Sequence, residues 1–231
     1  MFTIWIANHK FTIANKYPYV KNLCKDYQCD ETETEEYISV SDAEIQMEQT
    51  EKYSEAYLES LAIQRKLTET LIQHDILLLH GSVVAVDGKA YLFTALSGTG
   101  KSTHTKLWMD LFGSRAIMVN DDKPFLHISD KQVIVYGTPW NGKHNRGNNI
   151  AVPLKAICIL ERGTENEIEP LRKKDCWKYL LQQSYHSENI DNMTKTLSLL
   201  DRLQNLVEMF HLKCNMEIDA AQKAYDGMNR K

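Results

Sequence analysis

The stretch LFTALSGTGKSTHTKLW, residues 92–108, constrains this chain more than any other. The apolar run at 90–95 predicts a buried strand and residues 103–112 predict a helix, so a glycine-containing loop joins strand to helix. Glycines tolerate the backbone angles that turn successive N–H groups inward, and the start of a helix adds the positive end of its dipole. The order of strand, loop, Lys-Ser and helix therefore predicts a phosphate-binding loop.

The residues of this loop have distinct expected roles. Lys101 reaches the β- and γ-phosphates of a nucleotide, and the Ser102 hydroxyl ligates Mg²⁺. Ala95 stands where the common motif has its first glycine, which ordinary backbone angles at that position permit. The alternative is a turn that contains Gly-Lys-Ser by coincidence. The expected nucleotide-binding residues are Ser97, Gly98, Thr99, Gly100, Lys101, Ser102 and Thr103.

A pair of aspartates, Asp121 and Asp122, follows the apolar strand expected at 116–120. Carboxylates at the end of a strand beside a phosphate-binding loop are placed to hold Mg²⁺ and to take a proton from a nucleophile. A turn with solvated carboxylates is the alternative. Beside the glycine loop, the metal-binding and catalytic interpretation is the stronger one.

Three elements coincide: His80-Gly81 before a hairpin, SGTGKST at 97–103, and Asp121-Asp122 after the next strand. Over about residues 78–128 this arrangement resembles the kinase domain of HPr kinase/phosphorylase and the nucleotide-binding core of ATP-dependent phosphoenolpyruvate carboxykinase. The resemblance implies that Asp121 is the general base and Asp122 a Mg²⁺ ligand. It implies that His80 lies by the catalytic aspartate, as in the kinase, or ligates metal, as in the carboxykinase. A buried His80 satisfied by backbone groups is the alternative.

The chain also departs from both families. No Arg, Tyr and Lys set for gripping phosphoenolpyruvate precedes the loop, and Thr103 replaces the Glu of typical HPr kinase loops. The later Arg-Gly signature of HPr kinases is replaced by YGTPWNGKHNRGNN at 136–149. In that loop Lys143, His144 and Arg146 could clamp the transferring phosphate or an acidic acceptor, with Lys143 and Arg146 as expected catalytic residues. A solvated surface loop is the alternative.

Composition limits the partners of the chain. A net charge of -4 argues against general nucleic-acid binding. The longest apolar stretches, such as 76–80 and 156–160, are strand-sized, so no membrane partner is expected. The start MFTIWIANHK lacks a secretion signal, which predicts a cytoplasmic protein. Five scattered cysteines predict reduced, packed thiols, and the acidic run at 30–36 predicts a solvated loop.

The predicted fold class is α/β: a phosphoenolpyruvate carboxykinase/HPr kinase-like P-loop core with a small N-terminal α+β portion and a helical C-terminal part. The predicted division is 1–75 for the N-terminal portion and 76–231 for the P-loop kinase-like domain. Ser41-Asp42-Ala43-Glu44 has the pattern of a helix start, and one or two helices are expected from there to about 74. A last strand is expected at 212–216, before a helix that starts near 219.

The expected function is that of an HPr kinase-like phosphotransferase with ATP and Mg²⁺ as cofactors, transferring the γ-phosphate to a hydroxyl, most simply a Ser or Thr of a protein or peptide. One alternative is a kinase for a small hydroxylated molecule. Another is a regulatory protein that binds nucleotide without catalysis, which would not need the aspartate pair. A carboxy-lyase is disfavoured by the missing substrate-binding residues. The acceptor, ATP against GTP, phosphorolysis, homo-oligomer formation and the role of residues 1–75 stay open.

Overall fold

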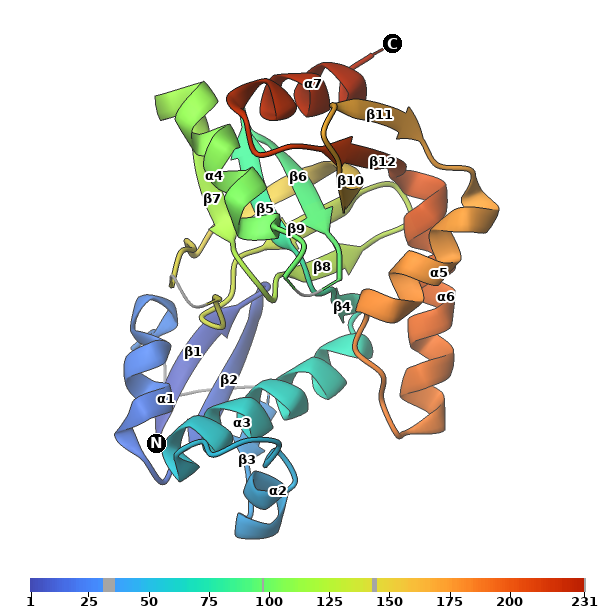
Figure 1. Cartoon of the computed structure of the whole chain (residues 1–231). Coiled ribbons are helices and arrows are strands. Elements are labelled where there is room, and N and C mark those ends of the chain that lie inside the picture. Colours follow the sequence, from blue (N-terminus) through green and yellow to red (C-terminus); the bar gives the residue numbers. More distant parts are fainter. Residues whose placement is uncertain (31–35, 97, 143–144, 231) are drawn as a thin grey trace.

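The computed structural model describes residues 1–30, 36–96, 98–142 and 145–230, and it is a mixed α/β protein (Figure 1). The strands are β1 (Phe2–Ile6), β2 (His9–Ala14), β3 (Glu36–Ser39), β4 (Ile76–Leu78), β5 (Ser82–Val86), β6 (Lys89–Thr94), β7 (Ala116–Asn120), β8 (Phe125–Ile128), β9 (Val133–Tyr136), β10 (Ala151–Arg162), β11 (Glu167–Pro170) and β12 (Glu208–Cys214). The α-helices are α1 (Pro18–Leu23), α2 (Asp42–Gln46), α3 (Glu55–Ile72), α4 (Lys101–Phe112), α5 (Lys173–Gln183), α6 (Ile190–Leu206) and α7 (Ile218–Met228).

Within the described residues, nine strands form the large central sheet, in the order β4-β8-β9-β10-β6-β5-β7, with β12 pairing both β10 and β11. The long strand β10 joins two halves of this sheet. Its first residues pair antiparallel with β9, and its later residues pair in parallel with β6 on one side and β12 on the other. The end of β10 therefore lies beside the end of β6, from which the glycine loop starts.

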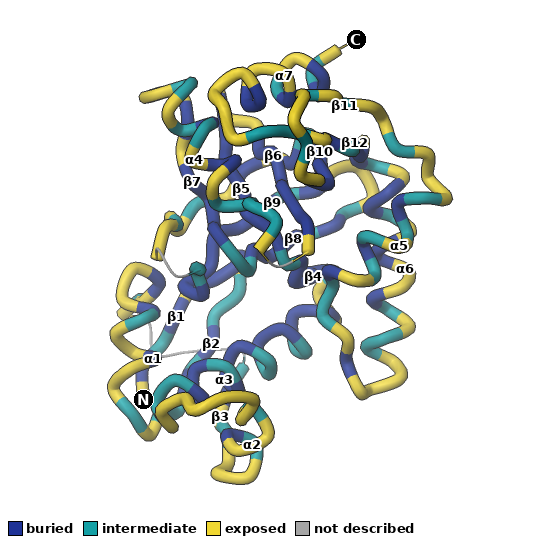
Figure 2. Tube along the Cα trace, viewed as in Figure 1, coloured by how far each residue is buried: buried dark blue, intermediate teal, exposed yellow. Residues whose placement is uncertain are grey.

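The large sheet is covered on both faces, as the alternation along β6 requires. Tyr91 and Phe93 pack in one cluster with Trp108 of α4 and residues of α7. Leu92, which points the other way, packs in a second cluster with residues of α5 and α6. Figure 2 shows the strands of this sheet largely dark blue between helices with exposed outer faces. This two-sided burial holds the loop between β6 and α4 on a rigid support.

The N-terminal residues form a separate three-stranded sheet, β1-β2-β3. Ala7 and Asn8 have positive φ of 49° and 64°, which suits the tight turn between β1 and β2. Helix α3 lies between this sheet and the large one. One hydrophobic cluster includes Phe11 of β2, Leu67 of α3 and Phe125 of β8, so the two sheets share a core. The division at 75/76 stays a prediction.

Several local expectations are confirmed. Ser41 and Glu44 form a reciprocal capping box at the start of α2, and two helices occupy the region up to 72. All five cysteines are free. The C-terminal part differs from its helical description, because β11 and β12 join the large sheet there, and the strand expected at 212–216 is Glu208–Cys214. None of the described helices is both long and apolar enough to cross a membrane.

Candidate active site

The loop between β6 and α4 has the backbone that its glycines suggested. Gly98 and Gly100 have φ of 78° and 121°, in the left-handed region. A Cβ atom at either position would meet no other atom within 4 Å, so backbone conformation rather than crowding requires glycine there. Ser97, expected to bind the nucleotide, lies outside the described residues.

Helix α4 starts directly at this loop without a capping side chain. Gly100 is its N-cap residue, and its first turn holds no acidic side chain. By contrast, Ser41, Ser54 and Asn189 cap the starts of α2, α3 and α6 with their side chains. The first N–H groups of a helix need an acceptor from outside the helix, and an anion is well suited to that place.

Lys101 is the first residue of α4 and turns its side chain back over the loop. Its Nζ donates to the Ala95 carbonyl oxygen at 3.2 Å. Burial lowers the pKa of the Lys101 ammonium, while the negative charges of Asp122 and Asp121 oppose that shift. The lysine and both aspartates, which belong to separate motifs of the sequence, therefore act on one another electrostatically.

Arg162, at the end of β10, supports the loop from the other side. Its Nη2 donates to the Gly98 carbonyl at 2.5 Å and its Nε to the Thr99 carbonyl at 3.2 Å. In a trans peptide the N–H points opposite to the C=O, so the amide of Gly100 faces away from Arg162. No sequence pattern singled out this residue. Its local signal is a cation that follows the apolar run 156–160 after one residue, Glu161.

Asp121 is buried, with 4% of its surface exposed. Ser82 Oγ of β5 donates to Asp121 Oδ1 at 2.7 Å, and Thr105 Oγ1 of α4 lies 3.0 Å from Ser82 Oγ. A Cβ atom at Gly142 would lie 3.8 Å from Asp121 Oδ2, so the smallest residue borders the second carboxylate oxygen. One oxygen of Asp121 is thus fixed by a hydroxyl, and the carboxylate lines the cleft described below.

His80 forms an ion-pair contact with Asp122, its Nε2 lying 3.1 Å from Asp122 Oδ1. Both side chains are about one-third exposed, at 37% and 30%, so His80 is not the buried histidine of the alternative interpretation. The backbone holds this residue on both sides, because its N–H donates to the Gln183 carbonyl and its own carbonyl accepts from Thr94 Oγ1. The His80 side chain therefore contacts Asp122, whereas the kinase resemblance placed it by Asp121.

The turn that carries the aspartates is shaped by Asn120, which is fully buried at the end of β7. Its Oδ1 accepts from the backbone N–H groups of Asp122 and Lys123 at 2.8 and 2.6 Å. Its Nδ2 donates to the carbonyl and the hydroxyl of Thr138. These hydrogen bonds hold the turn in one conformation, so Asp121 and Asp122 are fixed in position relative to the sheet.

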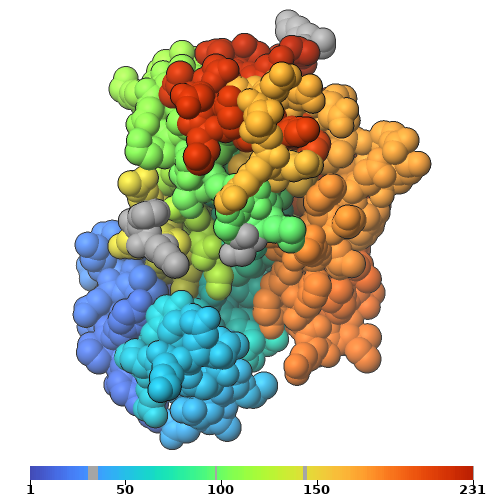
Figure 3. All heavy atoms as spheres, in the orientation of Figure 1, coloured from blue at the N-terminus to red at the C-terminus, as the bar shows by residue number. Residues whose placement is uncertain are grey.

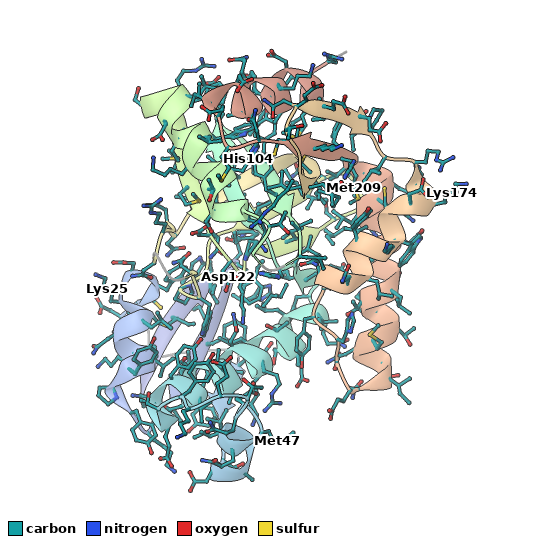
Figure 4. All side chains as sticks on the ribbon, viewed as in Figure 1. Lys25, Met47, His104, Asp122, Lys174 and Met209 are labelled. Carbon is teal, nitrogen blue, oxygen red and sulfur yellow. The ribbon has the colours of Figure 1, made fainter. Side chains whose placement is uncertain are left out.

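A cleft of 1010 Å³ brings the predicted elements together with residues from the N-terminal part. Figure 3 shows the N-terminal residues, in blue and cyan, below the green segment that carries the glycine loop, and Figure 4 shows Asp122 at the boundary between these parts. Tyr57 of α3 lines this cleft, and burial, together with Tyr19 and Asp122, raises its pKa. The cleft is lined by Tyr19, Asn22, Leu23, Tyr57, His80, Gly98, Gly100, Lys101, Ser102, Thr103, Asp121, Asp122, Asn141, Gly142 and Asn145.

Described residues of the segment 136–149 reach the cleft. Asn141, Gly142 and Asn145 line it, while Arg146 is exposed beside them. Lys143 and His144 lie outside the described residues. The catalytic roles of Lys143 and Arg146 therefore stay predictions.

A smaller cavity of 410 Å³ lies on the other side of the loop, bounded by Gly98, Thr99 and Arg162. Its wall includes the side chains of Leu107, Leu160 and Met216, together with His104. Burial lowers the pKa of His104 to about 4, so its imidazole is neutral near pH 7. Trp108 Nε1 donates to His104 Nε2 at 3.1 Å, which leaves the ring proton on Nδ1.

The donor set at the cleft fits a small hard cation. Among the described residues, no three His, Cys, Asp or Glu side chains gather into a metal-binding group. Mg²⁺ in nucleotide sites uses one or two carboxylates and completes its shell with phosphates and water, so it does not need such a group. The Ser102 hydroxyl and the carboxylates of Asp121 and Asp122 face one cleft and meet this requirement.

A model of the family described as SynChlorMet cassette protein ScmC matches residues 45–221. The chain belongs to this family. The ScmC match spans α3, the glycine loop, the aspartate pair and β12, so the parts that build the cleft lie largely within it.

Other comparisons add less. No curated protein matches this ScmC-family chain. Among solved structures, the Hpr(Ser) kinase/phosphatase from Coxiella burnetii aligns with 55% of this chain and 97% of its own, at 15% identity and a TM-score of 0.31.

Proposed function

We propose that this ScmC-family chain is a Mg²⁺- and ATP-dependent phosphotransferase of the HPr kinase-like type. The observation that carries the proposal is the single cleft shared by Lys101, the uncapped start of α4 and the aspartate pair. Phosphate-binding groups and a carboxylate able to accept a proton are both needed for phosphoryl transfer to a hydroxyl. A protein that only binds nucleotide has no use for the second carboxylate.

Each group has a role in this proposal. Lys101 and the N–H groups of the loop and first helical turn bind the phosphates, with Thr103 beside them. Ser102 and Asp122 hold Mg²⁺, which when bound neutralises charge on the β- and γ-phosphates. Asp121, fixed through Ser82, accepts the proton of the acceptor hydroxyl. His80 holds Asp122 in place. Lys143 and Arg146 stabilise the charge that develops during transfer.

The two cavities divide the substrates. The 410 Å³ cavity has apolar walls and a neutral His104, whose Nδ1 lies 4.0 Å from Cys214 Sγ, and such walls suit the base of the nucleotide. The larger cleft takes the phosphates, and its wall of Tyr19, Asn22 and Tyr57 is left for the acceptor. We propose a Ser or Thr of a protein or peptide as the acceptor, with a small hydroxylated molecule as the second candidate.

The proposal is tested by measuring Mg-ATP binding by calorimetry and phosphate transfer with labelled ATP. Serine- and threonine-containing peptides and small polyols serve as acceptors. Saturable binding with transfer to one acceptor class supports the proposal. Binding without transfer to any hydroxyl favours the regulatory nucleotide-binding protein, and absence of binding contradicts the phosphate-loop assignment itself.

A further inference from the structure

A third cavity, of 290 Å³, shares His80 with the cleft. It lies between α3 and the segment that follows α5, and its lining includes Glu48, Gln64, Arg65, Lys123 and Tyr185. Lys123 directly follows the aspartate pair in sequence. A ligand group in this cavity is therefore bounded by His80 and Lys123, the neighbours of the proposed catalytic carboxylates.

Gln64 presents a buried donor to this cavity. Only 4% of its surface is exposed, and its Oε1 accepts from Lys123 Nζ at 3.2 Å. An ammonium group only donates hydrogen bonds, so this contact fixes the amide with its oxygen toward Lys123 and its Nε2 on the other side. The buried Nε2 has no hydrogen-bond partner among the described residues.

Arg65, the next residue on α3, presents a second donor. Its Nε donates to Glu48 Oε1 at 2.7 Å, whereas its buried Nη2 has no partner among the described residues. The Tyr185 hydroxyl donates to Glu69 Oε1 at 2.9 Å and does not accept from Arg65 Nη2. Two adjacent residues thus offer N–H groups whose burial is costly without an acceptor.

The charges facing the cavity favour an anion. Among the lining residues, Arg65 and Lys123 are cations, and the carboxylate of Glu48 is already paired with Arg65. Glu69 also acts on Arg65, but it lies outside the lining and accepts from the Tyr185 hydroxyl. His80 is shared with Asp122. A carboxylate brings two acceptor oxygens and one negative charge, which matches two donors beside this small positive excess. A neutral amide lacks the negative charge. A phosphate has more negative charge and more acceptor oxygens than two donors and a small positive excess can satisfy.

We propose that this cavity binds a carboxylate group of the phosphate acceptor, a statement that rests on the function proposed above. Gln64 Nε2 and Arg65 Nη2 donate to its two oxygens, and Lys123 adds charge. The acceptor hydroxyl and this carboxylate then belong to one molecule that spans the third cavity and the cleft on either side of His80.

The test titrates the full chain with acetate and follows the side-chain amide signal of Gln64 by ¹⁵N NMR. We expect acetate to shift this signal saturably, and we expect acetamide and inorganic phosphate to bind much more weakly. Gln64→Met should weaken acetate binding by about tenfold or more, the worth of one hydrogen bond to a charged group. Loss of the contact between Gln64 Oε1 and Lys123 should lower the melting temperature of Gln64→Met slightly. A purely structural role for Gln64 would lower the melting temperature without weakening acetate binding.

Gln46→Met, an exposed position on α2, is the matched control and should bind acetate like wild type. Arg65→Lys is the second variant. It keeps the positive charge beside Glu48 but removes Nη2, so it should also weaken acetate binding. Equal acetate binding in wild type, Gln64→Met and Arg65→Lys overturns the proposal.

Mg-ATP binding measured on the same variants separates this proposal from the kinase proposal, since all three should bind Mg-ATP like wild type. Acetate binding without Mg-ATP binding would support the carboxylate site and contradict the kinase proposal. Glycerate and a blocked Ser-Glu peptide then compete against acetate. Displacement by glycerate assigns the carboxylate to a small hydroxy acid, and displacement by the peptide assigns it to an acidic peptide. Displacement by neither contradicts the acceptor role.

Discussion

Ser82 Oγ donates a 2.7 Å hydrogen bond to Asp121 Oδ1, although the two residues are 39 positions apart. The antiparallel pairing of β5 with β7 sets Val83 opposite Asn120, and so brings the neighbouring Ser82 and Asp121 together. Strand register therefore orients the carboxylate to which we assign proton transfer. Thr105 of α4 adjoins the same hydroxyl, which links this carboxylate to the helix that starts at the glycine loop.

Ser82→Ala removes the donor to Asp121 without altering the loop. Because a hydrogen bond to a charged group contributes about 1.5–3 kcal/mol, we expect kcat to fall roughly tenfold or more. Mg-ATP affinity should stay near wild type. The measurement is steady-state transfer kinetics beside calorimetry, with Thr105→Ser, which keeps its hydroxyl, as the control. An unchanged kcat in Ser82→Ala would mean that the contact does not position the base.

Lys101→Met removes the ammonium that lies over the loop. Ligand binding to the native state raises the melting temperature by mass action, so Mg-ATP should raise that of wild type and leave the variant nearly unchanged. Lys106→Met is the matched control on the same helix, because Lys106 is exposed and pairs with Asp110. A full Mg-ATP shift in Lys101→Met would remove the phosphate-binding assignment.

Substitution of the two aspartates should affect Mg-ATP affinity and phosphate transfer differently. Asp121→Asn is nearly isosteric and should keep Mg-ATP affinity while transfer falls by roughly 10²–10⁴-fold, the usual contribution of a positioned general base. Asp122→Asn should weaken Mg²⁺ binding, and with it both Mg-ATP affinity and turnover. Nucleotide titration beside a transfer assay distinguishes the two. Full activity in Asp121→Asn would show that another group takes the proton.

Arg162→Met releases the carbonyls of Gly98 and Thr99. We expect Mg-ATP affinity to fall by roughly ten- to a hundredfold, since two charge-assisted hydrogen bonds that hold the loop in shape are lost. Arg172→Met is the control, because that arginine is exposed and pairs with Asp175 in the first turn of α5. Equal affinities for the two variants would show that the loop keeps its shape unaided.

His104 makes the free energy of unfolding depend on pH. Burial lowers its pKa in the folded protein from 6.5 to about 4, so between these values the unfolded chain binds a proton that the folded chain excludes. Stability should therefore fall as the pH drops from about 6.5 toward 4, by up to about 3 kcal/mol from this group. Denaturant titrations of wild type and His104→Gln across that range isolate the effect. Parallel curves for the two proteins would exclude it.

The sequence was most informative where the residues that determine a local structure lie within one short segment. Gly98, Gly100 and Lys101 lie between a strand and a helix that are both visible as patterns, so the loop could be predicted. The support of the loop could not. Arg162 reaches Gly98 because β10 pairs with β6, and that pairing has no local signature.

The N-terminal wall of the cleft was unpredictable for the same reason. Tyr57 lines the cleft near Asp122 because of how α3 packs against β3 and β4, and that packing has no local signature in the sequence. Helix α1 was missed although Pro18, at its first position, is a usable start signal. His80 was found from its motif, but its contact with Asp122 rather than Asp121 is set by geometry that the motif does not contain.

The pairing of β12 with β10 has a consequence for the synthesis of this protein on the ribosome. Residues 208–214 cover the edge of β10 from Ala156 to Arg162, and they are made some fifty residues after it. Until they emerge, β10 presents an open row of backbone donors and acceptors, the kind of edge that recruits strands from other chains. The arginine that steadies the glycine loop sits on that edge. Chains truncated before residue 208 should therefore aggregate through this exposed edge.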